Sequence, residues 1–205
     1  MQSDPIGLEG GENSFVYVGD NPNTLFDKNG LWASQHGFYV HQEANKRVLR
    51  WYLTEEQIEI LNYATEVVDS KPNQTGPNAY KHAMRGTWSE EATSSLVPAS
   101  YARSLANNWV REQFANAQYF KSIGDMDSAL FYFGKALHTL QDSTSPSHSG
   151  FKSWTGHERI GKIIKHVSGE IFYWQTKNTN LEYVTEVAYS WFYWDNLPSG
   201  DLFTF

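Results

Sequence analysis

The residues best suited to chemistry lie in the stretch 131–148, which carries two histidines and an aspartate at defined spacings. Gly134, His138 and Asp142 follow one another every fourth residue, so they share one face of a helix. Apolar residues of the same segment repeat at helical spacing beside this row, so we expect His138 and Asp142 to point inward. A segment of Ser, Thr and Pro residues then ends the helix and brings His148 back near its end. Neutral imidazoles and a carboxylate are ligands suited to zinc.

A purely structural interpretation competes with the metal site. A single His-x3-Asp pair is often a half-buried histidine hydrogen-bonded to an aspartate at a helix end, since such pairs arise by chance. However, a second pair of the same spacing, His166 and Glu170, lies on another predicted helix and also flanks an apolar stripe. Two such pairs in a chain with only 7 histidines favour a metal site.

The composition predicts one full-size domain, because the chain has 205 residues of which 16% are aromatic. The formal net charge of −7 argues against a protein that follows nucleic-acid backbones, since phosphate binding normally needs a basic face. The absence of cysteine excludes thiolate ligands, so any metal must be held by His, Asp, Glu or main-chain groups. No run is long enough for a membrane span, and the N-terminus lacks the pattern of a signal peptide.

Residues 32–205 are predicted to be almost entirely helical. Thr54 and Gln57 form a capping box that opens one helix, and breaker residues mark 69–77 as a loop. Asn78 is expected to cap a short helix that carries His82. The other helices are expected at about 42–52, 100–123, 126–142, 160–174 and 181–194, and the aromatic run 191–194 is assigned to the core.

The first 31 residues are rich in Gly, Asn and Asp and lack amphipathic periodicity beyond a strand-like segment at 14–18. Their motifs, Asp-Pro-Ile-Gly-Leu at 4–8 and Asp-Lys-Asn-Gly-Leu at 27–31, resemble the end of the RHS (YD-repeat) core, with Lys in place of the second Pro. The resemblance implies self-cleavage between Leu31 and Trp32 that depends on Asp4 and Asp27. It also implies two parts, 1–31 as the end of a repeat core and 32–205 as a C-terminal toxin domain.

The toxin part resembles a second family, the bacterial zinc-dependent phospholipases C, which share a fold with single-strand-specific zinc nucleases. The resemblance is carried by residues 116–121, by 125–134 and by the motif His138-x3-Asp142-x3-Pro146-x-His148. It implies an all-α, single multi-helix domain that holds three zinc ions.

Residue by residue, the resemblance implies that His138 and Asp142 share one zinc, and that Asp142 also reaches a neighbouring zinc. Asp69, from a loop, and His82 would belong to the same zinc as His138. Asp69 would also act as a general base.

The remaining ligands are assigned in the same way. His148 would begin the set of another zinc, completed by His166 and Glu170. His157 is a rival to His166, but Gly161 stands where its carboxylate partner would be.

The last zinc of that family uses the amino group and carbonyl of an N-terminal Trp and a nearby His. Cleavage after Leu31 would give Trp32 a free amine, with His41 as its partner and His36 as the alternative. An amide nitrogen has no available lone pair, so cleavage would complete the metal site.

These resemblances predict a zinc-dependent, phospholipase C-like phosphodiester hydrolase that acts as the toxin of an RHS protein, delivered or secreted by other machinery. Its expected partners are a phospholipid or membrane-surface substrate, a cognate immunity protein and the RHS cage of the precursor, with nucleic acid less favoured. A zinc nuclease of the same fold and a non-enzymatic binding module are the alternatives.

Overall fold

A computed structural model describes residues 25–26, 34–35, 40–70, 73–156 and 179–204. The chain divides into two compact units, Met1–Tyr39 and Val40–Phe205, whereas the sequence places its boundary after Leu31. In the first unit, strand β1 (Leu25–Phe26) pairs antiparallel with strand β2 (Ser34–Gln35). The strand expected at 14–18 and both RHS-like motifs, at 4–8 and 27–31, lie outside the described residues.

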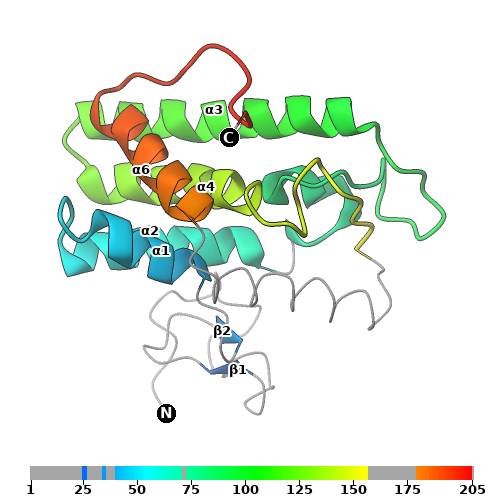
Figure 1. Ribbon diagram of the computed structural model, residues 1–205, viewed down its shortest axis with the longest axis horizontal. Coiled ribbons are helices and arrows are strands. Elements are labelled where there is room, and N and C mark those ends of the chain that lie inside the picture. Colours follow the sequence, from blue (N-terminus) through cyan, green and yellow to red (C-terminus); the bar gives the residue numbers. More distant parts are fainter. Residues whose placement is uncertain (1–24, 27–33, 36–39, 71–72, 157–178, 205) are drawn as a thin grey trace. The chain divides into compact units, whose positions relative to one another are not determined.

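The second unit is a bundle of helices organised around one central helix, α4, so the all-α prediction is confirmed. Helix α4 contacts α2, α3, α6 and the 3₁₀ helix η4, and α6 also crosses α1 (Figure 1). No described helix is both long and apolar enough to cross a bilayer. The helices are α1 (Val40–Leu49), α2 (Glu55–Asp69), η4 (Gly76–His82), α3 (Ala99–Ser122), α4 (Met126–Asp142) and α6 (Thr179–Tyr193).

The starts of α2 and α4 are determined by local capping. At α2, Gln57 N–H donates to Thr54 Oγ1 over 3.3 Å, and Thr54 N–H donates to Gln57 Oε1 over 3.0 Å, which confirms the predicted capping box. At α4, the Asp125 carboxylate accepts from the Ser128 N–H over 3.0 Å. Gly124 separates α3 from α4 in the left-handed region at φ 82°, which a residue with a Cβ rarely adopts.

Three details differ from the sequence predictions. Asp69, predicted to begin the loop 69–77, is the last residue of α2. The short helix before His82 begins at Gly76, so Asn78 lies inside it and does not cap it. Pro77 is the reason, because its fixed φ and missing N–H favour the first turn of a helix. At the end of α6, Phe192 is buried as expected, but Tyr193 and Trp194 are 54% and 73% exposed because they pass beyond the packed face.

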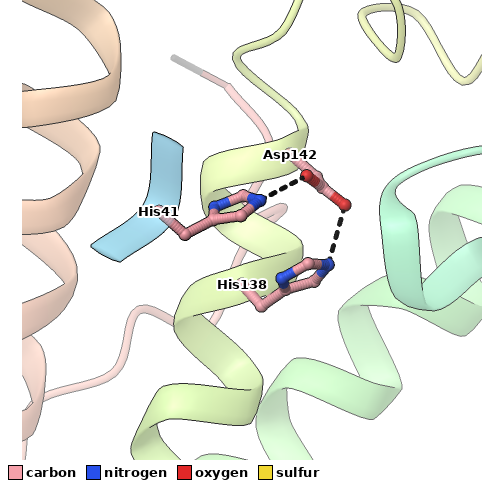
Figure 2. A group of neighbouring side chains, drawn as sticks. All are labelled: His41, His138 and Asp142. Carbon is pink, nitrogen blue, oxygen red and sulfur yellow. Dashed lines mark ion pairs between the residues drawn. The ribbon is translucent and has the colours of Figure 1, made fainter. Parts of the chain in front are cut away.

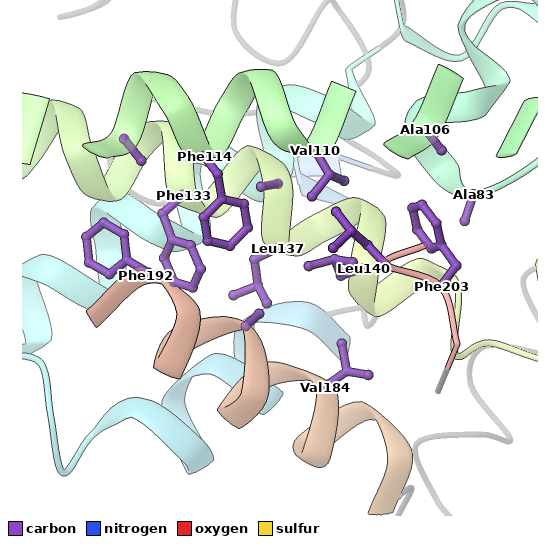
Figure 3. Close-up of a cluster of buried hydrophobic side chains, with 14 of the residues drawn as sticks. Ala83, Ala106, Val110, Phe114, Phe133, Leu137, Leu140, Val184, Phe192 and Phe203 are labelled. Carbon is purple, nitrogen blue, oxygen red and sulfur yellow. The ribbon is translucent and has the colours of Figure 1, made fainter. Parts of the chain in front are cut away.

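The core is built on the apolar face of α4. Phe133 stacks on Phe192 with ring centroids 4.7 Å apart and meets Phe114 edge-on at 5.7 Å, so α3, α4 and α6 are joined through these rings (Figure 3). Leu137 and Leu140 continue this face and are fully buried. The core therefore holds α4 rigidly on one side, while its polar row faces another.

Gly134, the first residue of that polar row, lies at a close approach of α4 to α2. A Cβ at this position would lie 2.7 Å from Ala64 Cβ and 2.7 Å from the Leu61 carbonyl oxygen. The sequence predicts that Gly134 leaves room above His138 and Asp142, and the backbone of α2 occupies that room.

The C-terminal segment is tied to α3 by side chains on one face of that helix. Arg103 Nε donates to Asp201 Oδ2 over 2.6 Å, and Asn107 Nδ2 donates to Asp201 Oδ1 over 3.0 Å. Arg111 donates to the carbonyls of Pro198 and Gly200. These bonds hold the C-terminal segment against α3, and the next two residues, Leu202 and Phe203, are buried in the core.

Replacing Gly134 by Ala is expected to destabilise the fold by about 1–3 kcal/mol, because the added methyl overpacks the α2–α4 contact. This range is the net effect: the gain in helix propensity, about 1 kcal/mol, offsets only part of the overpacking, because the methyl would meet the Leu61 carbonyl, which belongs to the backbone. Denaturant unfolding monitored by circular dichroism measures the change. The exposed substitution Ser104→Ala in α3 is the control, and equal stability of the two variants would contradict the close approach.

Replacing Asp201 by Asn is expected to lower stability at neutral pH and to lose this effect in acid. Burial raises the pKa of Asp201, but hydrogen bonds from Asn107 and the Phe203 N–H, and the Arg103 guanidinium, hold it below its usual value. A depressed folded pKa stabilises the fold above the unfolded pKa, and this contribution disappears as pH falls through the folded pKa. Unfolding free energies of both proteins at stepped pH test this. The exposed change Glu91→Gln is the control, and a gap that persists in acid would refute the assignment.

Candidate metal centre

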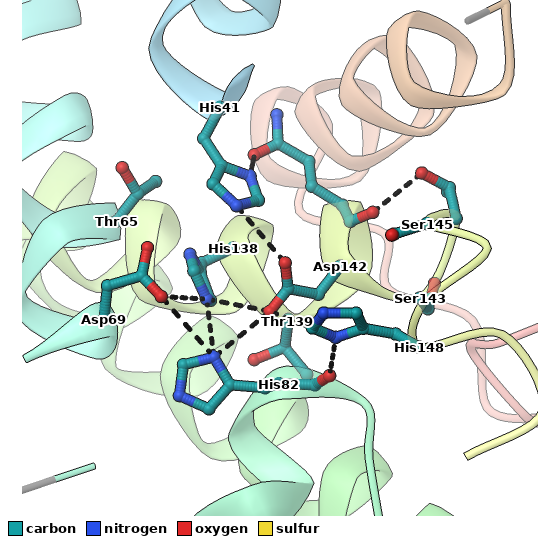
Figure 4. Close-up of polar contacts among 12 residues, drawn as sticks. His41, Thr65, Asp69, His82, His138, Thr139, Asp142, Ser143, Ser145 and His148 are labelled. Carbon is teal, nitrogen blue, oxygen red and sulfur yellow. Dashed lines mark hydrogen bonds and ion pairs between the residues drawn. The ribbon is translucent and has the colours of Figure 1, made fainter. Parts of the chain in front are cut away.

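The candidate site lies where the ends of several helices converge on the C-terminal turn of α4 (Figure 4). Most of its residues are close to the end of a helix, which explains how separate helices bring short side chains together. The residues are His41 in the first turn of α1, Asp69 at the end of α2, His82 at the end of η4, His138 and Asp142 in the last turns of α4, and His148 in the turn beyond.

His138 and Asp142 point into the bundle as predicted, with exposed fractions of 0% and 4%. Their spacing of one helical turn places His138 Nε2 3.0 Å from Asp142 Oδ2. The apolar face of α4 therefore fixes the direction of both groups.

His82 joins the same point from η4. Its Nδ1 atom lies 3.2 Å from Asp142 Oδ2 and 3.1 Å from His138 Nε2. Asp69 Oδ1 lies 3.7 Å from His82 Nδ1 and 3.6 Å from His138 Nε2. Ligands of a tetrahedral zinc at about 2.0–2.1 Å are separated by about 3.3–3.4 Å, so these distances match the edges of such a site. Asp69, His82 and His138 form one group that can hold a metal ion.

His41 reaches the other oxygen of the same carboxylate. Its Nε2 atom lies 3.2 Å from Asp142 Oδ1, and the His41 and His138 rings are 4.5 Å apart (Figure 2). His41, His138 and Asp142 form a second group that can hold a metal ion. The two oxygens of Asp142 thus face different imidazoles, which is the arrangement of a carboxylate that can bridge two metal ions.

The charges at the centre are compatible with a cation. Burial by itself raises the pKa of Asp142, but the nearby His138 and His148 imidazoles and the close side-chain contacts with His138 and His41 hold it well below its usual value. Three acceptor-capable atoms, one each from His82, His138 and Asp142, lie within 3.0–3.2 Å of one another. A single proton among these three atoms can form a hydrogen bond between only two of them. If both imidazole nitrogens carried a proton, their N–H groups would lie against each other, whereas a metal cation can accept a lone pair from all three atoms.

The other nitrogen of each of two imidazoles takes no part in these contacts. Within the part of the chain that is described, His82 Nε2 and His138 Nδ1 are buried without a hydrogen-bond partner. Each ring therefore makes its described polar contacts only through the nitrogen that points toward Asp142.

His148 lies beside this centre but in neither three-residue group of the described chain. Its Nδ1 atom contacts the carbonyl oxygen of His82 and lies 3.7 Å from Asp142 Oδ2. The other predicted site residues and their rivals lie outside the described residues: Trp32, His36, His157, His166 and Glu170.

Asp69 connects the centre with solvent. Its side chain is 50% exposed, while those of His138 and Asp142 are 0% and 5% exposed. Gln74 Nε2 donates to Asp69 Oδ1 over 3.3 Å and to the Asp69 carbonyl over 3.2 Å, which holds the end of α2 in place. A metal ion or a small substrate can therefore approach from the Asp69 side.

The sequence reasoning missed Gln141, whose Oε1 atom lies 2.9 Å from His41 Nδ1. Gln141 is buried and adjacent to Asp142. An amide next to a candidate ligand on a buried helix is the only signal that it carries in the sequence. Its partner is 100 residues away, so spacing could not reveal the contact.

Comparison with known proteins gives no match to a protein-family model, to a curated protein or to a solved structure.

Zinc is expected to stabilise the metal-stripped protein, by about 2.7 kcal/mol at a free concentration one hundred times the dissociation constant. Asp142→Asn is expected to weaken zinc binding at least about tenfold, because it removes the carboxylate that both groups share. Isothermal titration and zinc-dependent melting measure both effects. Asp127→Asn, exposed at the start of the same helix, is the control, and equal binding by both variants would refute the centre.

Proposed function

We propose that the chain is a zinc-dependent phosphodiester hydrolase of the phospholipase C type. The observation that carries this proposal is the buried Asp142 carboxylate, whose two oxygens face His41 on one side and His82 and His138 on the other. Such a shared carboxylate suits neighbouring metal ions, and paired metals are a recurrent device of phosphodiester hydrolysis.

The described residues would hold zinc in two sets that share Asp142. Asp69, His82 and His138 would serve one ion, and His41 the other, with the amine of Trp32 as an additional ligand after cleavage. His148 would serve a third ion with His166 and Glu170. Bound zinc supplies Lewis acidity that polarises the phosphate and lowers the pKa of water toward neutrality.

Asp69 is proposed to take the proton from the attacking water. It is the most exposed carboxylate of the centre, so water can reach it, and Gln74 fixes its orientation through Oδ1. A carboxylate positioned in this way contributes by general-base catalysis. Asp142, buried and held anionic by its histidines, instead serves as the fixed negative group that orients the imidazoles.

A polar cavity of about 230 Å³ borders His148 and offers a place for the substrate's polar part. Its lining residues include Ser143, Thr144, Ser149 and Arg103, and the Arg103 guanidinium is paired with Asp201. A lining of this polarity suits a phosphate or a hydroxylated headgroup more than an acyl chain. With the net charge of −7, this favours a phospholipid over a nucleic-acid strand.

The biological setting is proposed from the RHS-like motifs. The domain would be the toxin of an RHS protein, released after cleavage at Leu31–Trp32, carried in the repeat cage and neutralised in its producer by an immunity protein. Cleavage would also create the Trp32 amine, so that release and metal-site completion coincide.

Incubation with zinc and either phospholipid vesicles or single-stranded DNA tests the substrate. The chain that begins at Trp32 is expected to release soluble phosphorylated headgroups from vesicles of phosphatidylcholine and phosphatidylethanolamine, and the chain that begins at Met1 to release less. Asp127→Asn should retain this activity, and Asp142→Asn should lose it.

Each other outcome of this experiment has a defined meaning. DNA cleavage without lipid hydrolysis would replace the phospholipase by the nuclease alternative. Equal activity of the two chains would reject the role of the Trp32 amine. Absence of bound zinc would reject the hydrolase and favour a binding module.

A further inference from the structure

We propose that Gln141 is a positioning residue that fixes the tautomer of His41 and so reserves His41 Nε2 for a metal ion. The inference rests on the proposed function only in treating His41 as a ligand. It concerns a contact between α1 and α4 that is supported by Thr185 on α6 and, through Asn45 of α1, by Asn62 on α2.

The orientation of the Gln141 amide is fixed by its two acceptors. Gln141 Nε2 donates to Thr185 Oγ1 over 2.8 Å and to Asn45 Oδ1 over 2.9 Å. The Thr185 hydroxyl proton is already directed to the Leu181 carbonyl, 2.7 Å away, so Thr185 can only accept from Gln141. The nitrogen of the Gln141 amide must therefore face Thr185.

Asn45 gives the same orientation from another direction. Its Nδ2 atom donates to Asn62 Oδ1 over 3.0 Å, which leaves Asn45 Oδ1 as the acceptor toward Gln141. Both N–H groups of the Gln141 amide are thus used, one for each acceptor. Only its carbonyl oxygen remains for His41.

The tautomer of His41 follows from this orientation. The Gln141 Oε1 atom accepts only, so His41 Nδ1, 2.9 Å away, must carry the proton that it donates. A neutral His41 then has its lone pair on Nε2, 3.2 Å from Asp142 Oδ1. Two acceptors that face each other at this distance repel unless a metal ion or, in its absence, a second ring proton lies between them. Gln141 thus keeps His41 in the form that binds metal and disfavours the form that would simply donate to Asp142.

The network is rigid enough for this role because it is buried and joins four helices. Asn45 and Thr185 are fully buried and Gln141 is 1% exposed. Asn45 lies on α1, Asn62 on α2, Gln141 on α4 and Thr185 on α6. Water therefore has little access to the amide, and rotating it would break two hydrogen bonds at once.

Two substitutions at Gln141 separate positioning from packing. Gln141→Met keeps the length of the side chain but offers no acceptor, so His41 can move its proton to Nε2 and bond to Asp142. Gln141→Glu restores an acceptor for His41 while it loses both donors. We expect zinc affinity to fall by about 10–100-fold in the Met variant and to recover in part in the Glu variant.

Thr185→Val is the matched control. It removes one acceptor of the Gln141 amide in the same network, but it leaves the contact between Gln141 and His41 in place. We expect it to bind zinc within about threefold of the unaltered protein, well short of the change expected from loss of the acceptor.

The direct test is the tautomer of His41 in the metal-stripped chain of 205 residues, read from ring-nitrogen chemical shifts with histidine labelled by ¹⁵N. The unaltered protein and Gln141→Glu are expected to show the Nδ1–H form, and Gln141→Met a shift toward the Nε2–H form. Competition with a chromophoric chelator measures zinc affinity, and circular dichroism establishes that each variant is folded.

An Nε2–H tautomer in the unaltered protein overturns the inference by itself, even if Gln141→Met does not fold. Undiminished zinc affinity in a folded Gln141→Met protein also overturns it. Failure of the proposed function is distinguishable, because a protein that cleaves neither lipid nor DNA can still show the tautomer and its dependence on Gln141.

Discussion

The carboxylate of Asp142 is buried at the convergence of the helix ends, and the arrangement of the surrounding side chains depends on stabilising its charge. A buried anion costs several kcal/mol unless it is paired and hydrogen-bonded. Here imidazoles meet both oxygens, His41 at Oδ1 and His82 and His138 at Oδ2. These imidazoles stabilise the charge of Asp142, and they also bring several potential metal ligands together. The cluster opens to solvent at the half-exposed Asp69, so a metal ion can reach it.

The position of Asp142 depends on helix α4, which packs against the rest of the bundle through two faces. The apolar face stacks on α3 and α6, and the row that begins at Gly134 faces α2 at backbone distance. Because both faces are packed, the last turn of α4 has little freedom to rotate. A small shift of the Asp142 carboxylate would disturb its contacts with His41 on one side and with His82 and His138 on the other. The packing of α4 away from the site therefore supports the geometry of the site.

A second layer of polar groups fixes the histidines themselves. Gln141 ties His41 to α6 through Thr185, and the carbonyl of His82 contacts His148. The contact with Gln141 occupies His41 Nδ1 and leaves His41 Nε2 directed to Asp142, which is the arrangement expected around a metal ligand.

The helical content, the capping box at Thr54, the central helix 126–142 and the inward direction of His138 and Asp142 all follow from the sequence, because periodicity and capping are local. The start at Gly76 of the helix that carries His82 follows from Pro77, a local signal that the sequence prediction places in a loop. The exposure of Tyr193 and Trp194 does not follow from the sequence, since it depends on how the end of α6 meets the rest of the fold. His82 and His138 are 56 residues apart and His41 and Gln141 are 100 apart, so no spacing rule relates them. The residue types capable of binding metal were therefore evident in the sequence. Only the tertiary structure decided that Asp142 faces imidazoles through both oxygens and that Gln141 orients His41, because both depend on where separate helices end in space.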